Sequence, residues 1–371
     1  MKNIALILVV AATALAVLYV AMPKSNQQPT ETETPEQNEN GQAPAVEVVA
    51  EGLEIPWDIA FLPGGEMLVT ERTGHVIEIK TDGTKREIKI EGVSQGGEGG
   101  LLGLVLHPDF AFNHFVYLYM SAPGGAGQTQ NKVVRYKYLD GKLMEDKVII
   151  EGIPGAIYHD GGRMEFGPDE RLYITTGDAT NAAIAQDLQS LGGKILRLQD
   201  DGVIPTDNPF QSAVWSYGHR NPQGLAWDSA GRLWETEHGR SGVTSGLDEI
   251  NLIEAGANYG WPESEGDTVQ PGTVTPARHS GATDTWAPAS LAYLNGSLFF
   301  GGLRGEALYE AVLSGTHIVE FKEHFKNEFG RIRTVRVGLN GMLYLTTSNT
   351  DGRDSPNTGD DKIIKINPEL L

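Results

Sequence analysis

From about residue 46 onward, hydrophobic and polar residues alternate in short runs that are typical of half-buried β-strands. Each run follows a turn rich in Gly, Asn, Asp or Pro, and six such units recur along the chain. The strands that follow the six turns are 66–71, 115–121, 171–178, 232–239, 297–305 and 342–348. Their spacing of roughly 45–65 residues is typical of a repeated four-stranded unit.

Further strand patterns follow each turn, such as 75–79, 132–138, 194–198, 248–253 and 362–366. The six units predict an all-β fold: a six-bladed β-propeller with four-stranded antiparallel blades. Residues 46–49 are expected to complete the last blade beside 362–366, which closes the ring without a free edge. A β-sandwich array is the alternative architecture. Helical periodicity is confined to two short candidates, 306–313 and 317–325.

The N-terminus differs from the rest of the chain. Lys2 is followed by an uncharged and mostly apolar run, 4–22, so residues 1–22 are predicted to be a signal peptide or an N-terminal membrane anchor. Both interpretations imply an extracytoplasmic protein, either periplasmic, secreted or tethered to the cell surface. Residues 23–45 are acidic and poor in large apolar side chains, which predicts a disordered linker. The folded domain is therefore expected to span 46–371.

Charge and cysteine content exclude several classes of function. The net charge of −20 makes nucleic acid and anionic membrane surfaces poor partners for the folded domain. An anionic ligand would need a local cluster of basic residues or metal ions. The absence of cysteine excludes disulfides, thiolate metal sites, a cysteine nucleophile and lipidation of a cysteine.

A histidine in a glycine-rich loop is the first candidate for chemistry. His159 begins the sequence His-Asp-Gly-Gly-Arg, and Asp178 ends the strand pattern that follows it. Such a histidine can act as a general base, because glycines allow a substrate to approach the backbone and an aspartate can select the tautomer of the ring. A histidine that only stabilises a turn is the alternative.

Arginines form the second group of candidates. The first, Arg220, shares a tight turn, 217–224, with Asn221 and Gln223. Four arginines lie in glycine-rich turns or alternate along one strand: Arg220, Arg304, Arg331 and Arg333. In an acidic chain this placement indicates a polyanionic ligand. Solvated surface arginines are the alternative.

A third group offers oxygen ligands. The run Glu237-His238-Gly239-Arg240 is followed by Asp248-Glu249 and then by 258–262. Carboxylates beside a glycine-rich backbone suit calcium. No EF-hand loop is present, so the spacing alone does not define a site.

Taken in order, these motifs resemble those of the soluble quinoprotein glucose/sorbosone dehydrogenase family, in particular its aldose sugar dehydrogenases. The matching stretches cover nearly the whole folded domain: 55–74, 96–110, 159–178, 192–210, 217–227, 236–239, 248–262, 298–309 and 330–346. The resemblance implies a sugar dehydrogenase that uses pyrroloquinoline quinone (PQQ) and Ca²⁺. Such an enzyme oxidises aldoses at C1 to lactones and transfers hydride to C5 of the quinone. Electrons then pass to an external acceptor, such as a quinone or a cytochrome.

The resemblance also implies roles for individual residues. His159 would be the general base, Asp178 would orient it, and Arg220 would lie beside the C5 carbonyl oxygen. The residues implied to bind the cofactor, whose three carboxylates require basic partners, are Arg220, Asn221, Gln223, His238, Arg304, Arg331 and Arg333. Glu98 would face the substrate.

Two calcium sites are implied as well. The carbonyl groups of Gly239 and Arg240 would bind the calcium that contacts the quinone, and Glu249 and Tyr259 would hold a second, structural ion. Arg240 stands where the family usually has proline, and the loop after it is longer, so the ligand geometry there stays open.

Two other functions are compatible with a propeller. A calcium-dependent lactonase would need several carboxylates converging on one central ion, whereas the candidates here are mainly arginines. A non-catalytic, surface-tethered glycan-binding propeller would not need His159, Asp178 and the arginines together. The sequence leaves open whether the protein is a monomer or a dimer.

Overall fold

The computed structural model describes residues 45–371 except 243–244 and 269, with no side chain described for Ala126. The predicted segment 1–22 and nearly all of the predicted linker lie outside the described residues. No helix within the described ranges is long and apolar enough to cross a membrane.

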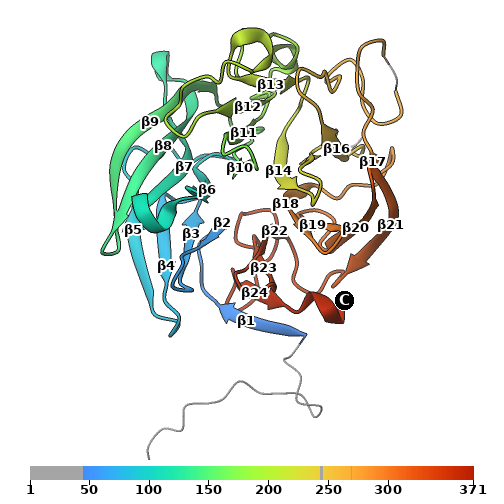
Figure 1. Ribbon diagram of the computed structural model, residues 1–371. Coiled ribbons are helices and arrows are strands. Elements are labelled where there is room, and N and C mark those ends of the chain that lie inside the picture. The colour runs from blue at the N-terminus through green and yellow to red at the C-terminus, as the bar shows by residue number, and fades with distance from the viewer. Residues whose placement is uncertain (1–44, 243–244, 269) are drawn as a thin grey trace, which may run out of the picture. The chain divides into compact units, whose positions relative to one another are not determined.

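Six four-stranded antiparallel sheets form a ring, with the first strand of each sheet nearest the middle (Figure 1). The first blade comprises β2 (Pro56–Phe61), β3 (Met67–Glu71), β4 (His75–Ile79) and β5 (Lys85–Lys89). The second comprises β6 (Leu101–Leu106), β7 (Phe115–Pro123), β8 (Thr129–Leu139) and β9 (Lys142–Pro154). The third comprises β10 (Met164–Phe166), β11 (Leu172–Thr176), β12 (Lys194–Leu198) and β13 (Val214–Tyr217).

The other half of the ring is built in the same way. The fourth blade comprises β14 (Pro222–Trp227), β15 (Leu233–Glu237), β16 (Glu249–Ile253) and β17 (Arg278–His279). The fifth comprises β18 (Pro288–Leu294), β19 (Ser297–Gly302), β20 (Leu308–Ser314) and β21 (His317–His324). The sixth comprises β22 (Ile332–Val337), β23 (Leu343–Thr347), β24 (Ile363–Ile366) and β1 (Val46–Ala50). The predicted six-bladed propeller is confirmed, and the sandwich alternative is wrong.

The ring closes through its first and last strands. β1 pairs antiparallel with β24, so that Val46 lies opposite Ile366 and Val48 opposite Ile364. The expected completion of the last blade by residues 46–49 is therefore confirmed. The six predicted turns each join the first and second strands of a blade.

The two candidate helices are wrong, because residues 306–313 and 317–325 largely form β20 and β21. The reason is tertiary packing: Tyr309 of β20 stacks on Phe300 and Phe321, whose ring centroids lie 4.9 and 5.6 Å away. Described helical structure is limited to one α-helical turn and four short 3₁₀ segments: α1 (Phe110–Asn113), η1 (Gly125–Gly127), η2 (Ala182–Ala185), η3 (Pro209–Gln211) and η5 (Pro368–Leu370).

The hydrophobic core is divided among the interfaces between blades. Each of the six described core clusters contains residues of at least two neighbouring blades, and one that joins the second and third blades also includes Trp57 of the first. Trp234 of the fourth blade, for example, packs in one cluster with Phe300 of the fifth. Burial of these apolar faces holds the blades together and fixes the positions of the loops that they carry.

Because neighbouring strands are antiparallel, the start of each first strand and the end of each second strand lie at the same rim of the ring. Glu98, His159 and Arg220 precede first strands, whereas Asp178 and Arg304 follow second strands. The topology thus brings candidates that are far apart in sequence to one face.

Candidate active site

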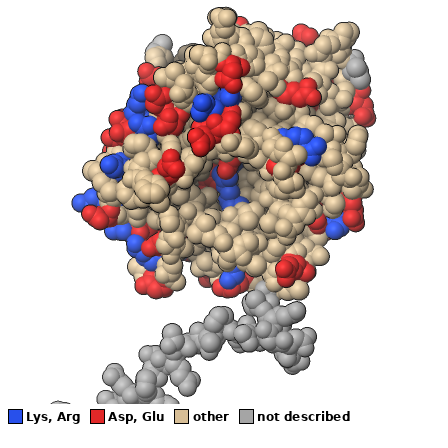
Figure 2. Space-filling view, viewed as in Figure 1, with Lys and Arg blue, Asp and Glu red and all other residues tan. Residues whose placement is uncertain are grey.

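A cleft of about 440 Å³ opens at this rim. Figure 2 shows basic side chains in the hollow at the middle of the molecule. The candidate residues that line the cleft are Glu98, His159, Arg220, His238, Gly239, Arg240, Arg304 and Arg331. Five arginines but only two carboxylates are among the described lining residues. The cleft therefore lacks the ring of acidic ligands that a calcium-dependent lactonase would need.

Within this cleft, His159 and Asp178 form a hydrogen-bonded pair. Nδ1 of His159 lies 2.7 Å from Oδ1 of Asp178. An ionised carboxylate can only accept, so Nδ1 carries the proton and Nε2 keeps a free lone pair. Asp178 is 1% exposed and is held by two further donors, the Thr180 N–H at 2.8 Å and the Trp261 indole N–H at 2.9 Å. Three donors therefore fix the carboxylate that orients the imidazole.

Glycines make the close approach of the two loops possible. A Cβ on Gly177 would lie 1.9 Å from the carbonyl oxygen of His159, and one on Gly161 would lie 2.7 Å from that of Thr175. His159 itself adopts a left-handed backbone conformation, with φ of 64°. A non-glycine residue in this conformation stores strain, which is typical of functional sites.

The tight turn after β13 connects the base to the arginines. Oδ1 of Asn221 accepts the N–H of Gly161 at 3.1 Å, while its buried Nδ2 has no partner among the described residues. Arg220 is 6% exposed and lies over the Trp261 ring, with Cζ 5.3 Å from the centroid. Its guanidinium donates to Ser241 Oγ at 3.0 Å, and burial lowers its pKa.

The two arginines near the start of β22 are in different environments. Arg331 lines the cleft and forms a 2.9 Å salt bridge with Asp351. Arg333 is 3% exposed and is not among the lining residues. It donates to Gln223 Oε1 at 2.5 Å, while its buried Nε lacks a partner among the described residues. Burial lowers the pKa of Arg333 to about 9.

The predicted polyanion site is therefore brought together only in part. Arg220, Arg304 and Arg331 line the cleft, whereas Arg333, Asn221 and Gln223 do not. Arg304 is exposed and donates to Ser245 Oγ at 2.9 Å.

The loop after β15 is organised by a carboxylate that the sequence analysis did not assign. Asp248 accepts the N–H groups of Gly239, Trp286 and Ala287 at 2.6–2.8 Å, as well as the Thr285 hydroxyl. A Cβ on Gly239 would lie 2.2 Å from the Leu247 carbonyl oxygen, so only glycine fits there.

The other residues of this loop are placed as follows. Arg240 bridges to Gly246 through backbone hydrogen bonds, and its side chain lies 3.1 Å from Glu265. His238 lines the cleft, and its buried Nε2 lacks a partner among the described residues.

A second acidic group lies inside the fourth blade. Ligand atoms of His219, Glu235 and Glu237 are all within 4.8 Å of one another. Glu237 lies opposite Glu249 across the strands β15 and β16, and the ring of Tyr259 stacks on His219 at 4.7 Å. Burial raises the pKa of each of the three glutamates, and repulsion by Glu237 raises those of Glu235 and Glu249 further. This geometry can hold a divalent cation, which would neutralise the crowded carboxylates.

Glu98 links the base to the opposite side of the cleft. Its Oε2 accepts the N–H of His159 at 3.1 Å, and its Oε1 forms a 3.0 Å salt bridge with Arg353. Burial by itself raises the pKa of Glu98, but His238, Arg353 and the His159 N–H outweigh it and hold the pKa at about 2.

Sequence reasoning missed several residues around the cleft. Trp261, which holds Asp178, is 83 positions from it, and no local pattern connects the two. Arg72 is a second missed residue, and it is only 7% exposed. Burial lowers its pKa, whereas the nearby charges of Asp351 and Glu98 raise it. It follows the second strand of its blade, as Arg304 does, and that shared position is the signal that could have found it.

The model of the family described as Glucose / Sorbosone dehydrogenase matches residues 53–356. The chain belongs to this family. The resemblance expected from the sequence is thereby confirmed, and the protein is an oxidoreductase.

Three relatives show how far the similarity extends. An aldose sugar dehydrogenase of Escherichia coli is 33% identical over 362 residues, which cover 87% of this chain and 92% of the relative. The PQQ-bound structure of an aldose sugar dehydrogenase from Streptomyces coelicolor is 42% identical, with a TM-score of 0.80 and coverage of 87% and 98%. The quinoprotein glucose dehydrogenase B of Acinetobacter calcoaceticus is 31% identical over 59% of this chain and 52% of the relative.

Proposed function

We propose that the protein oxidises aldoses at C1 to lactones with PQQ and Ca²⁺, and passes the electrons to an external acceptor. The observation that carries the proposal is the combination in one cleft of the His159–Asp178 pair with two arginines that lack acidic partners among the described residues. Arg220 and Arg304 line this cleft, and neither forms a salt bridge with a described residue. The other three arginines of the lining each pair with a carboxylate: Arg240 with Glu265, Arg331 with Asp351 and Arg353 with Glu98. The apolar segment 4–22 supports an extracytoplasmic location, where such an acceptor would be met.

The charge balance of the cleft supports a polycarboxylate cofactor. Arg333 does not line the cleft, but the charges of Glu98 and Arg331, which do, act on it. It lacks a salt bridge within the described ranges, and burial lowers its pKa to about 9. A buried, unpaired guanidinium is unfavourable unless an anion is bound nearby. Arginine is well suited to carboxylates, because its planar fork can donate two parallel hydrogen bonds.

The backbone around Gly239 and the buried glutamates support calcium. Gly239 and Asp248 both line the cleft, where a cation would be held by oxygen atoms. Glu249 and Tyr259, with the adjacent Glu237, would hold the second ion. Calcium would favour the ionised form of the two carboxyl groups, whose pKa values burial raises to about 8.

When bound, the quinone accepts the hydride that leaves C1, and calcium acts as a Lewis acid on the carbonyl that is reduced. His159 Nε2 accepts the proton of the sugar C1 hydroxyl, because Nδ1 is already committed to Asp178. Asp178 stabilises the imidazolium that results. Arg220, packed on Trp261, keeps a fixed positive charge beside the base.

Reconstitution tests this function directly. Protein freed of metal with EDTA is incubated with PQQ and Ca²⁺, and dye reduction is followed with glucose as substrate. Glucose-dependent dye reduction that requires both additions is the expected result. A fully quinone-loaded protein that reduces no dye with any aldose would contradict the proposal.

Replacing arginines tests the cofactor site separately from turnover. Arg331→Ala or Arg333→Ala should weaken quinone binding by about 1–3 kcal/mol, the contribution of a charge-assisted hydrogen bond. Arg232→Ala is the matched control, since Arg232 pairs with Asp228 outside the cleft. Equal quinone affinity in all three variants would exclude Arg331 and Arg333 from the cofactor site.

A further inference from the structure

Lys194 is a buried charge that the proposed reaction does not use. It begins β12 in the third blade and is 0% exposed, yet it forms no salt bridge with a described residue. Its Nζ instead donates to three backbone carbonyl groups, those of Ile184 at 2.8 Å, Ala185 at 2.9 Å and Gly192 at 2.7 Å. These bonds use all three donors of the ammonium. Burial lowers the pKa of Lys194 to about 8, so the group is still mostly charged at pH 7.

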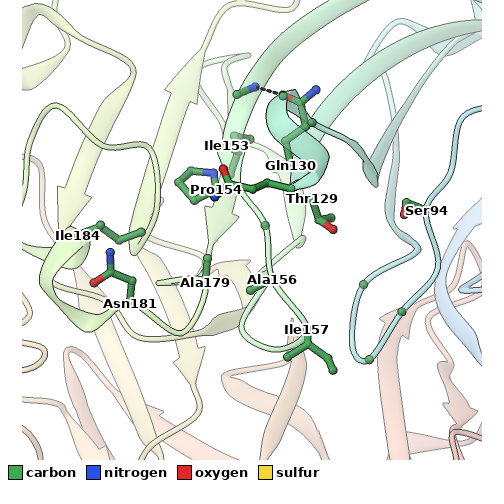
Figure 3. Close-up of a pocket in the computed structure, with 18 of the residues that line it drawn as sticks. Ser94, Thr129, Gln130, Ile153, Pro154, Ala156, Ile157, Ala179, Asn181 and Ile184 are labelled. Atoms are coloured by element: carbon green, nitrogen blue, oxygen red, sulfur yellow. Dashed lines mark hydrogen bonds between the residues drawn. The ribbon is translucent and has the colours of Figure 1, made fainter.

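The three carbonyl groups belong to residues 184–192, the clamped segment. Of the η2 residues at its start, only Ala185 is buried. Figure 3 shows Asn181 and Ile184 on the wall of a cavity of about 960 Å³ between the second and third blades, and the described residues that line it include no charged side chain. Because this side of η2 faces a cavity, side-chain packing does not hold it there. The ammonium gathers the carbonyl groups as a bound cation would.

Gln186 connects the clamped segment to the fourth blade. Its side chain forms a reciprocal amide pair with Asn258: Nε2 donates to Asn258 Oδ1 at 3.0 Å, and Asn258 Nδ2 donates to Gln186 Oε1 at 2.9 Å. The same Nε2 donates to the Trp261 carbonyl at 2.7 Å. The indole N–H of Trp261 in turn donates to Asp178 Oδ2 at 2.9 Å. A continuous series of contacts therefore leads from the Lys194 ammonium to the carboxylate that orients the base.

Two backbone hydrogen bonds tie the same region to the active site. The N–H of Gly193 donates to the Gly177 carbonyl at 2.8 Å, directly before Asp178. The N–H of Gly218, in the turn that carries Arg220, donates to the carbonyl of Ala185 at 3.0 Å. The clamped segment is thus in contact with both loops that supply catalytic candidates.

We infer that Lys194 and Gln186 are positioning residues for the His159–Asp178 pair. The ammonium fixes the clamped segment, and Gln186 passes that position to Trp261, whose indole holds the carboxylate against the imidazole. The inference rests on the proposed function, because it takes His159 as the general base. Loss of either side chain should let the carboxylate turn relative to the ring and should therefore lower kcat without weakening quinone binding.

Gln186→Leu tests the link to Trp261, because it removes the amide hydrogen bonds and keeps most of the side-chain volume. In quinone-loaded protein, kcat for glucose-dependent dye reduction should fall about tenfold, the order of loss expected when a supporting partner is removed. Gln189→Leu is the matched control. Gln189 lies in the clamped segment, is exposed and forms no side-chain hydrogen bond within the described ranges, so kcat should not change.

A double-mutant cycle separates positioning from a general structural effect. If Gln186 acts on the reaction through Asp178, Gln186→Leu should change kcat less than about twofold in the Asp178→Ala background. A residue that only stabilises the blade would lower kcat by the same factor in both backgrounds. An equal factor in the two backgrounds therefore overturns the inference.

Lys194→Met removes the ammonium and keeps an unbranched side chain. It should also lower kcat about tenfold at pH 7, again with less than about a twofold effect in the Asp178→Ala background. Lys362→Met is the matched control: Lys362 directly precedes the third strand of the sixth blade, but its Nζ faces Glu51 and Asp360 at 3.9 Å. If Lys194→Met does not fold, the glutamine variant decides the inference.

A spectroscopic measurement follows the position of Trp261 without turnover. The chain has six tryptophans, and the indole N–H signal of Trp261 is the one that Trp261→Phe removes from the ¹⁵N spectrum. In quinone-loaded protein, Gln186→Leu should move this signal toward its position in Asp178→Ala. An unchanged signal overturns the inference.

The outcomes distinguish this inference from the proposed function. A quinone-loaded wild-type protein that reduces no dye with any aldose overturns the proposed function, and the indole signal then still decides whether Gln186 positions Trp261 against Asp178. An active wild-type protein whose Gln186→Leu variant keeps normal kcat overturns the positioning role alone.

Discussion

At the scale of single residues, the candidate site depends on buried polar groups whose hydrogen-bond partners fix their orientation. Three donors hold Asp178 and keep its carboxylate facing His159. The imidazole keeps Nε2 free because Nδ1 is committed. This is the arrangement required of a general base near neutral pH.

His159→Gln should lower kcat about 10²–10⁴-fold, the usual contribution of a general base, while quinone affinity changes little. Asp178→Asn should reduce kcat less, because Asp178 supports the base without taking the proton from the sugar. Steady-state dye reduction, with quinone occupancy measured for each variant, checks both. Near-normal kcat of fully loaded His159→Gln would mean that another residue is the base.

Glu98 predicts a pH dependence of stability. Its pKa falls from 4.5 to about 2 on folding, so the ionised carboxylate stabilises the folded state above pH 4.5, and this contribution disappears as the pH falls toward 2. His238, the largest favourable influence on Glu98, has its own pKa lowered to about 4 and is uncharged at pH 7. Glu98→Gln should therefore lower the free energy of unfolding at pH 7 by about 1–2 kcal/mol, less than the full shift implies.

Urea unfolding of the wild type and Glu98→Gln between pH 3 and 8 measures this effect, and the difference should shrink steadily below pH 4.5. Glu91→Gln is the control, because Glu91 is 82% exposed in a surface ion pair. A difference that is the same at pH 3 and pH 8 would show that the charge of Glu98 does not stabilise the fold.

At the scale of elements, the fourth blade is unusual, because strands β15 and β16 place three glutamates next to one another in its interior. Asn251 donates to both Glu235 and Glu249, at 3.1 and 3.3 Å, and the Gly266 N–H donates to Glu249 at 2.8 Å. Because these donors are neutral, ionisation of the three carboxyl groups is unfavourable without a cation, as their raised pKa values indicate. A bound cation is the simplest source of compensation.

Metal removal should therefore destabilise the protein. Adding Ca²⁺ at 100 times its Kd to EDTA-treated protein should raise the free energy of unfolding by about 2.7 kcal/mol and raise Tm accordingly. Glu249→Gln should reduce this response, whereas Glu310→Gln should keep it, since Glu310 pairs with His324 in the fifth blade. Identical Tm values with EDTA and with Ca²⁺ would exclude a structural calcium.

At the scale of the whole molecule, charged side chains on first strands connect distant blades. Asp58 of the first blade lies 2.6 Å from Arg163, which precedes β10, and 2.9 Å from Arg336 of the sixth blade. Arg336 also pairs with Glu165 of the third blade, and Arg163 lies over the Trp57 ring at 4.2 Å. The inter-blade core clusters and this network together fix the positions of the blades relative to one another, and therefore of the loops at the rim.

Asp58→Asn should lower the free energy of unfolding by about 3–5 kcal/mol, because it leaves Arg163, which is fully buried, without its negative partner. Guanidinium unfolding followed by tryptophan fluorescence checks this. Glu87→Gln, which breaks an exposed pair with His75, should change stability by less than about 1 kcal/mol. Equal stability of the two variants would contradict a structural role for the network.

Part of this protein was determined by local sequence. Alternating strands and turn residues specified six blades, because strand periodicity and turn chemistry act over fewer than about ten residues. The repetition of these units also indicated that residues 46–49 would meet 362–366. The family motifs named His159, Asp178 and the arginines as candidates.

Only the tertiary structure decided how these residues meet. Residues 308–314 form a strand because Tyr309 packs on Phe300 and Phe321, which overrides local helical preference. Segments far apart in the chain meet at the Trp261–Asp178 hydrogen bond and at the buried glutamates of the fourth blade. They also meet around the uncharged cavity between the second and third blades. Arg333 lies outside the cleft lining, although its spacing from Arg331 predicted that both would share one strand face. That prediction is wrong because Arg331 precedes β22 and the strand register shifts between Ile332 and Thr334. Local patterns indicate which face of a strand a residue occupies, but the packing of neighbouring blades decides which residues lie against that face.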